Sequence, residues 1–177
     1  MTTVQTQRSL TERMKGAAML DVSTYEEVEA DQTATAQAAI VVGIVAVASA
    51  IGSLGAGGRG IIGALIGAVV GWVVWAGITY LIGDKLLGGT ATWGELLRTL
   101  GFAQAPGVLL VLGIIPFLGV LIKVAVSIWM LVAGIIAIRQ ALDFSTGKAV
   151  LTAVLGWLGL MLVTMLLGGL GWAASAF

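Results

Sequence analysis

Long stretches without a charged residue dominate this sequence and limit what it can fold into. The uncharged windows cover residues 32–58, 60–83, 99–122, 124–138 and 149–177. A membrane-spanning helix needs about 20 mostly apolar residues, each adding ~1.5 Å of length. Only 10% of the chain is charged, which is too little to cover the surface of a water-soluble domain. The sequence therefore predicts an all-α polytopic membrane protein.

The long apolar stretch in the middle of the chain has to be divided. Residues 107–138 are apolar except for Lys123, and as a single helix they would reach about 48 Å, well beyond a ~30 Å hydrocarbon core. Pro116 removes a backbone donor and Gly119 permits a left-handed conformation, so both favour a tight hairpin turn between two helices. The first leg is too short to cross the membrane by itself. We therefore expect it to form one span together with the amphipathic stretch before it, with a kink at Pro106.

This division gives a small head and a membrane domain. Residues 1–34 form a cytoplasmic amphipathic head, in which Leu10, Met14, Ala17 and Ala18 share one helix face and predict a short helix lying on the inner leaflet. Residues 35–177 form a five-helix membrane domain. The predicted spans are 35–54, 61–82, 105–115 kinked with the preceding amphipathic helix 92–104, 120–141 and 149–170.

The positive charges predict the orientation. With five spans, seven Lys and Arg residues fall on the side of the N-terminus and two, Arg59 and Lys123, on the other. Positive residues accumulate on the cytoplasmic side of membrane proteins. We therefore expect a cytoplasmic N-terminus and a C-terminus outside. Lys123 and Arg139 are expected to anchor the two ends of the fourth span by reaching the headgroups.

Small residues at a spacing of three or four predict where helices come close together. Helices in lipid associate through close backbone contact, so faces of small residues mark their seams. The glycine-rich segment 55–60 is expected to turn the chain so that the first two spans pack side by side. The predicted helix-packing seam comprises Gly63, Gly67 and Gly71 on the second span and Ala39, Gly43 and Ala46 on the first. A contact between copies of the chain is the alternative use of these faces.

Two further groups of residues have competing interpretations. The acidic run contains Glu26, Glu27, Glu29 and Asp31. It is either a solvated helix face or a docking surface for a cytoplasmic partner. Tryptophans well inside the spans are expected to fill the volume left by facing glycines; they are Trp72, Trp75, Trp129 and Trp157.

Missing residue types exclude several kinds of chemistry. The chain has no cysteine and no histidine, so we expect no catalytic residues, no metal ligands and no haem, iron–sulfur or other cofactor. Asp84 follows Gly83 as in intramembrane aspartyl proteases, but no second carboxylate lies inside a span to share a proton with it. A net charge of zero leaves no basic face for nucleic acid. The sequence thus predicts a protein that is not an enzyme.

Several segments together resemble the bacterial branch of the YIP family, the Ypt/Rab-interacting integral membrane proteins. The segments are RMKGAAMLD (13–21), YEEVEAD (25–31), LGFAQAP (100–106), IPFLG (115–119), IW (128–129), AIRQALD (137–143) and STGKA (145–149). The resemblance implies a five-helix fold with a cytoplasmic N-terminus, in the inner membrane of a bacterium. Eukaryotic members are linked to Rab GTPases and vesicle traffic through a long N-terminal region, whereas the head here has about 34 residues.

Three functions are compatible with these features. The first is a non-enzymatic scaffold or membrane-organising factor of the YIP type, with the lipid bilayer and a protein in the membrane or at its cytoplasmic face as partners. The second is an accessory subunit of a larger energy-transducing or transport complex. The third is a small channel or transporter, which would place polar residues along one face of a span; here Ser49, Ser127, Thr152 and Thr164 are scattered.

Overall fold

A computed structural model describes residues 8–54 and 61–174, and in these ranges all side chains except those of 61, 64 and 166–174. The described part is helical and contains no strand. The segment 55–60, expected to turn the chain between the first two spans, lies outside the described residues. The elements are α1 Leu10–Ala18, α2 Val22–Ala30, α3 Ala34–Gly52, α4 Ile61–Tyr80, the π-helical η2 Leu81–Leu86, α5 Trp93–Phe102, the 3₁₀-helical η3 Ala105–Ile114, α6 Leu118–Ala141 and α7 Thr146–Ala174.

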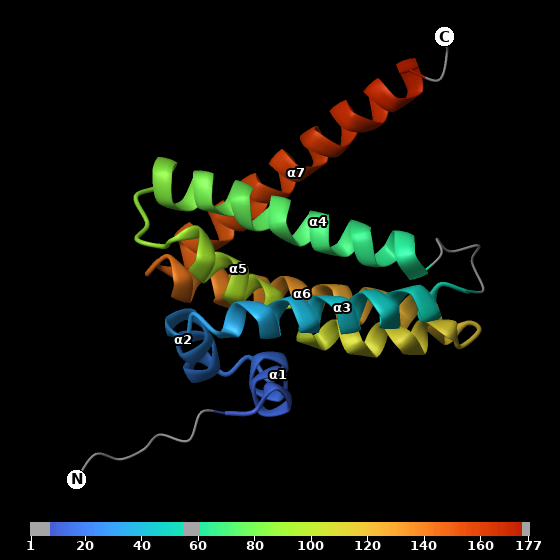
Figure 1. Ribbon diagram of the computed structural model, residues 1–177, viewed down its shortest axis with the longest axis horizontal. Helices are drawn as coiled ribbons and strands as arrows, with labels where there is room; N and C mark the ends of the chain where they lie inside the picture. Colours follow the sequence, from blue (N-terminus) through green and yellow to red (C-terminus); the bar gives the residue numbers. More distant parts are fainter. Residues whose placement is uncertain (1–7, 55–60, 175–177) are drawn as a thin grey trace.

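The helices confirm the predicted class of fold, an all-α polytopic membrane protein. Four helical segments are long and apolar enough to cross a membrane, and the bent pair α5 and η3 makes a fifth if it counts as one span. The irregular helix η3 contacts both α3 and α6. In Figure 1, α4 lies on the opposite side of α3 from the head, and α7 crosses behind α4 so that its C-terminal half projects away.

The third span is broken by a change of helix type. Helices α5 and η3 meet at an angle of 41°. The break lies at Ala103 and Gln104 rather than at Pro106, because a proline fits the first turn of a new helix, where its missing N–H is not needed. As an α-helix, the ten residues of η3 would cover only about 15 Å. The greater rise of the 3₁₀ form extends them to about 20 Å, so the short leg and α5 together have the length of a span if the bent pair counts as one.

The predicted hairpin turn is present, but a different residue adopts the strained conformation. Leu118 N–H donates to Pro116 C=O at 2.8 Å, and Gly119 N–H donates to Ile115 C=O at 2.8 Å. The residue with a positive φ, +64°, is Phe117 and not Gly119. Gly119 is buried, and a β-carbon at this position would collide with the carbonyl oxygen of Gly113. Glycine is therefore required here for close approach between the two legs.

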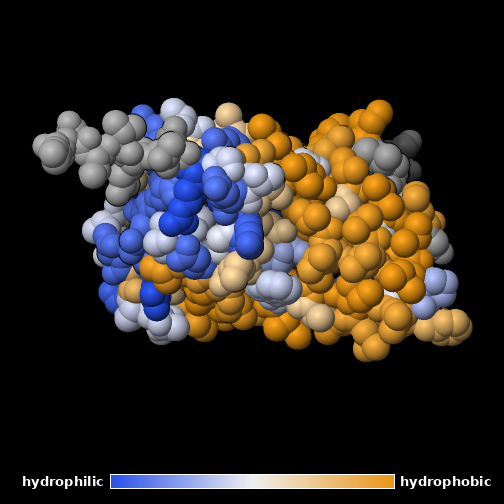
Figure 2. All heavy atoms as spheres, turned by 90° about the horizontal axis from the view of Figure 1, so that it is seen from below, coloured by the Kyte–Doolittle hydropathy of each residue, from blue (hydrophilic) through white to orange (hydrophobic). Residues whose placement is uncertain are grey.

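The head packs on the bundle instead of lying freely on the leaflet. The face of α1 that we expected to enter the lipid contacts the hydrophobic core, with Ala17 fully buried and Leu10, Met14 and Ala18 partly buried. Trp129 of α6 donates its indole N–H to Ala18 C=O at 2.8 Å, at the C-terminal end of α1. Figure 2 shows the result from below: hydrophilic residues gather at one end of the molecule and hydrophobic residues cover the other.

The predicted seam between α3 and α4 is wrong within a single copy of the chain. Gly63 and Gly67 are exposed, and no atom lies within 4 Å of a β-carbon placed on Gly63, Gly67, Gly71 or Gly43. On α3, Ala46 is buried and Ala39 is half-buried. The helix α4 does contact α3, but its buried residues include Trp72 and Ala76 and not these glycines. Trp72 donates its indole N–H to Leu97 C=O of α5 at 2.9 Å.

The close backbone approach occurs between α3 and η3 instead. A β-carbon on Gly52 would collide with the carbonyl oxygen of Leu110, and one on Gly113 would lie 3.0 Å from the carbonyl oxygen of Gly52. The expectation that tryptophans fill the space beside glycines is confirmed for Trp72 and Trp75, whereas Trp129 and Trp157 are 39% and 56% exposed. Trp72 lies 3.3 Å from a β-carbon on Gly101, and Trp75 lies 3.4 Å from one on Gly156.

Candidate partner surface on the head

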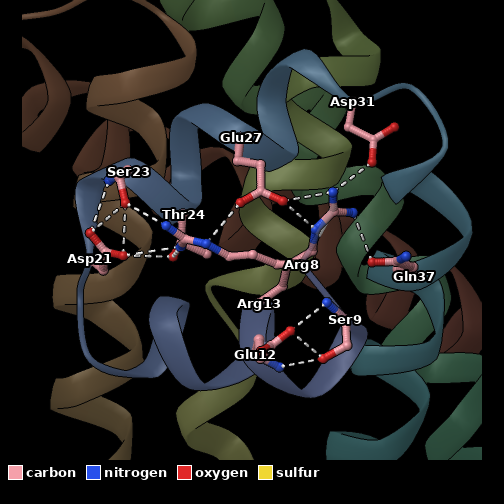
Figure 3. A network of polar contacts seen from close by, with 10 residues as sticks. All are labelled: Arg8, Ser9, Glu12, Arg13, Asp21, Ser23, Thr24, Glu27, Asp31 and Gln37. Atoms are coloured by element: carbon pink, nitrogen blue, oxygen red, sulfur yellow. Dashed lines mark hydrogen bonds and ion pairs between the residues drawn. The ribbon is translucent and has the colours of Figure 1, made fainter. Parts of the chain in front are cut away.

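A buried arginine ties the two head helices to the first span. Arg13 of α1 has no exposed surface. Its Nη2 lies 2.9 Å from Glu27 Oε1 and 2.8 Å from Asp31 Oδ2, and its Nη1 donates to Gln37 Oε1 of α3 at 3.0 Å. Figure 3 shows Arg13 reaching these partners from α1. A buried charge is stable only when it is paired in this way, so the network holds the head in one position.

A second arginine extends the network to the start of α2. Arg8 lies 3.2 Å from Glu27 Oε2 and 3.3 Å from Asp21 Oδ2, and it donates to Thr24 Oγ1 at 2.6 Å. Asp21 caps α2 by accepting a hydrogen bond from Ser23 N–H at 3.1 Å. Hydrogen bonds from Thr24 and Ser23 lower the pKa of Asp21.

A third arginine joins the head to the membrane domain from the other side. Arg98 of α5 is buried, and its Nε donates to the carbonyl oxygens of Val28 at 2.9 Å and Glu29 at 3.1 Å. These carbonyls belong to the last turn of α2, where backbone acceptors lack partners within the helix and the helix dipole favours a positive charge. Arg98 therefore caps α2 and fixes it on α5.

These contacts separate the residues of the predicted acidic run into two groups, one bound inside the head and one left for a partner. Glu27 and Asp31 bind the arginines of the head and serve the internal network. Glu26 is exposed and accepts a hydrogen bond from Gln140 Nε2 at 3.0 Å, and Glu29 is half-buried. The predicted partner surface is thus reduced to Glu26 and Glu29.

The structure brings further carboxylates to these two. Glu95 of α5 and Asp143, directly after α6, lie close enough to Glu29 to repel its charge, as does Glu26. We call Glu26, Glu29, Glu95 and Asp143 the acidic surface. The sequence analysis missed Glu95 and Asp143 because they follow Glu29 by 66 and 114 positions. Only the packing of α2 on α5 and α6 brings them near. The described residues contain no group of three or more acidic, histidine or cysteine side chains that could hold a metal ion.

Glu29 is the residue whose ionisation the fold perturbs most clearly on this surface. Burial and, after it, the charges of Glu95 and Asp143 together raise its pKa to about 7, although Arg98 acts in the opposite direction. The carboxylate is therefore ionised at the cost of stability above pH 7. A positively charged partner placed beside it would remove this penalty.

We expect Glu29→Gln to stabilise the protein at pH 8 and to have no effect near pH 4. Because the folded-state pKa of Glu29 is raised, the wild type loses stability as the pH rises from about 4.5 to about 7, whereas the variant does not. Glu29 is half-buried and still reached by solvent, so we discount the effect for solvent screening to about 1 kcal/mol. Thermal unfolding in one detergent at both pH values measures it.

Glu12→Gln serves as the matched control. The Ser9 hydrogen bonds lower the pKa of Glu12, so this substitution should not stabilise the protein at pH 8. Equal unfolding temperatures of Glu29→Gln and the wild type at pH 8 would show that the carboxylate bears no such penalty.

Comparisons with known proteins give one result. The family model described as Yip1 domain matches residues 22–168, which include α2, five further α-helices up to most of α7, and both irregular helices. Neither the curated proteins nor the solved structures give a match to this chain.

Proposed function

The chain belongs to the Yip1 domain family and is an integral membrane protein, and from this we propose that it is a non-enzymatic scaffold of the YIP type. In this role it holds a partner at the membrane through the acidic surface of its head. We propose that the head and the N-terminus face the cytoplasm and that the membrane is the inner membrane of a bacterium.

The observation that carries this proposal is a head that buried contacts tie to the bundle and that carries acidic side chains without an ion pair among the described residues. Arg13 and Arg98 fasten the head to α3 and α5 through buried contacts. No ion pair is formed by Glu26, Glu29, Glu95 or Asp143 within the described part of the chain. A partner segment rich in Lys or Arg is the complementary ligand for such a surface, because it gains attraction and relieves the repulsion around Glu29.

The alternative of an accessory subunit makes a different prediction about stoichiometry. A subunit of a larger complex co-purifies in fixed proportion, whereas a scaffold contact that depends on surface charge weakens as salt is added. The channel alternative has less support. In the described spans, the buried hydroxyls Thr79, Thr99 and Thr152 lie on three different helices, and those of Thr99 and Thr152 donate to carbonyls of their own helices.

The experiment is purification from native membranes in a mild detergent, comparing the double variant Glu26→Gln, Glu29→Gln with Glu12→Gln. We expect the double variant to bind its co-eluting partner about tenfold less tightly, corresponding to ~1.4 kcal/mol. The control, which also removes an exposed acid, should retain the partner. Equal recovery of the partner with all three proteins, or retention in 0.5 M salt at fixed stoichiometry, would refute the scaffold contact.

A further inference from the structure

An apolar cavity opens between α6 and α7 within the membrane-spanning region. Its volume is about 540 Å³, within the range of small-molecule sites. Trp75 of α4, Leu131 and Ile135 of α6, and Val154 and Trp157 of α7 contribute to its walls. Leu131, Val154 and Trp157 are each at least half exposed, so the cavity is open to the surrounding hydrocarbon.

A polar cavity of about 510 Å³ lies at the end of the same helix pair. It is lined by Arg139 and Asp143 at the end of α6 and by Ser145 and Thr146 at the start of α7. Arg139 follows Ile135 by four residues, and Thr146 precedes Val150 by four. Each therefore lies about one helical turn, ~6 Å along the axis, beyond the apolar cavity on the same helix face.

The polar cavity carries both signs of charge, each with capacity to bind a ligand. Arg139 donates its Nε to Gln140 Oε1 at 3.0 Å and forms no ion pair among the described residues. Asp143 accepts one hydrogen bond at Oδ2, from Thr90 Oγ1 at 2.8 Å, which leaves Oδ1 for another donor. The hydroxyls of Ser145 and Thr146 add neutral donors to the same lining.

We propose that these two cavities form a binding site for one phospholipid whose headgroup carries a primary ammonium, such as phosphatidylethanolamine. Its phosphate binds Arg139 and the hydroxyls, its ammonium binds Asp143, and an acyl chain enters the apolar cavity beside Trp157. The α6–α7 pair has charged side chains at its end and apolar ones toward its middle. A lipid molecule in a leaflet has the same arrangement, with its charged headgroup outside and its acyl chains inside. A second helix fits this order less well, because it would bring backbone and side chains, not an anion and a cation, to the polar end.

The same carboxylate distinguishes this lipid from its competitors. Phosphatidylglycerol offers the phosphate but only hydroxyls where Asp143 requires a donor with positive charge. Phosphatidylcholine carries the positive charge but has no N–H to donate. A hydrogen bond between charged groups contributes more than a neutral one, so the primary ammonium is the preferred partner.

Native mass spectrometry of the delipidated protein, with each of these three lipids added in turn and with equal acyl chains, tests the site. We expect phosphatidylethanolamine to bind about tenfold more tightly than phosphatidylglycerol, equivalent to ~1.4 kcal/mol. Asp143→Asn should abolish this preference, since Asn tolerates the positive φ of 52° at this position. Arg139→Gln should weaken the binding of all three lipids.

Two tryptophan substitutions on α7 test the apolar cavity. Val154→Trp fills it and should remove bound lipid, while Leu151→Trp, which is similarly exposed but lies outside the lining, should not. Thermal unfolding of both variants confirms that they are folded. Equal lipid binding by the two variants, equal affinity for the three lipids, or a polypeptide cross-linked to position 154 in native membranes would each overturn the proposal. Glu12→Gln, which lines neither cavity, should leave lipid binding unchanged. The lipids are added to the purified protein without any partner, so this outcome can fail while the scaffold contact holds, and the reverse.

Discussion

Arg13→Met is expected to release the head from the membrane domain, with a loss of about 3–5 kcal/mol in the stability of α1 and α2. The substitution removes the shared cation of Glu27 and Asp31. Both carboxylates then remain close together without it, and the methionine cannot donate to Gln37. Hydrogen–deuterium exchange in α1 and α2 measures the loss directly, because local opening of the head does not require the bundle to unfold.

Arg8→Gln is the matched control for this prediction. Arg8 binds Glu27 as well, but its side chain is 40% exposed, and exposed ion pairs contribute about 0–1 kcal/mol. We therefore expect a much smaller increase in exchange. If Arg13→Met exchanges no faster than Arg8→Gln, the buried network does not hold the head.

Gly52→Ala is expected to destabilise the membrane domain by about 1–3 kcal/mol, as overpacking does in other cores. The added methyl group would collide with the backbone carbonyl of Leu110, and the backbone nitrogen of Gly113 lies 3.4 Å away. A backbone neighbour cannot move aside by changing rotamer, so α3 and η3 would have to separate. Thermal unfolding in a mild detergent is the measurement.

Gly43→Ala, on the same helix, provides the control. No atom lies within 4 Å of a β-carbon there, and alanine has the better helix propensity by about 1 kcal/mol. We expect this variant to be as stable as the parent or slightly more stable. A decrease equal to that of Gly52→Ala would mean that the effect comes from the helix itself and not from the contact with η3.

The sequence alone was sufficient to locate the membrane-spanning helices, because lipid as the surrounding solvent restricts which residues a span can contain. Charges are excluded from lipid, so the uncharged windows located the helices α3, α4, α6 and α7 within a few residues of their observed bounds. The hairpin turn at Pro116 could also be predicted, because it depends on local sequence. Proline and the residues after it set the backbone conformation of the turn without distant contacts.

Sequence could not determine which helix faces meet. In water, buried residues are apolar and exposed ones polar, so periodicity reveals the packed face. In lipid both faces are apolar, and this signal disappears. The spacing of Gly63 and Gly67 therefore looked like a packing seam, although these glycines are exposed and the close approach is made by Gly52 and Gly113.

The acidic run shows the same limit outside the membrane. Glu26, Glu27 and Glu29 are neighbours in the sequence and have the same chemistry, so no local property separates them. Only the positions of Arg13 and Arg98 decided that Glu27 is bound internally while Glu26 and Glu29 join the acidic surface. The sequence determined the solvent of each segment and its helical form. The tertiary structure alone decided the partners of each charged side chain, because those partners come from elements far apart in the chain.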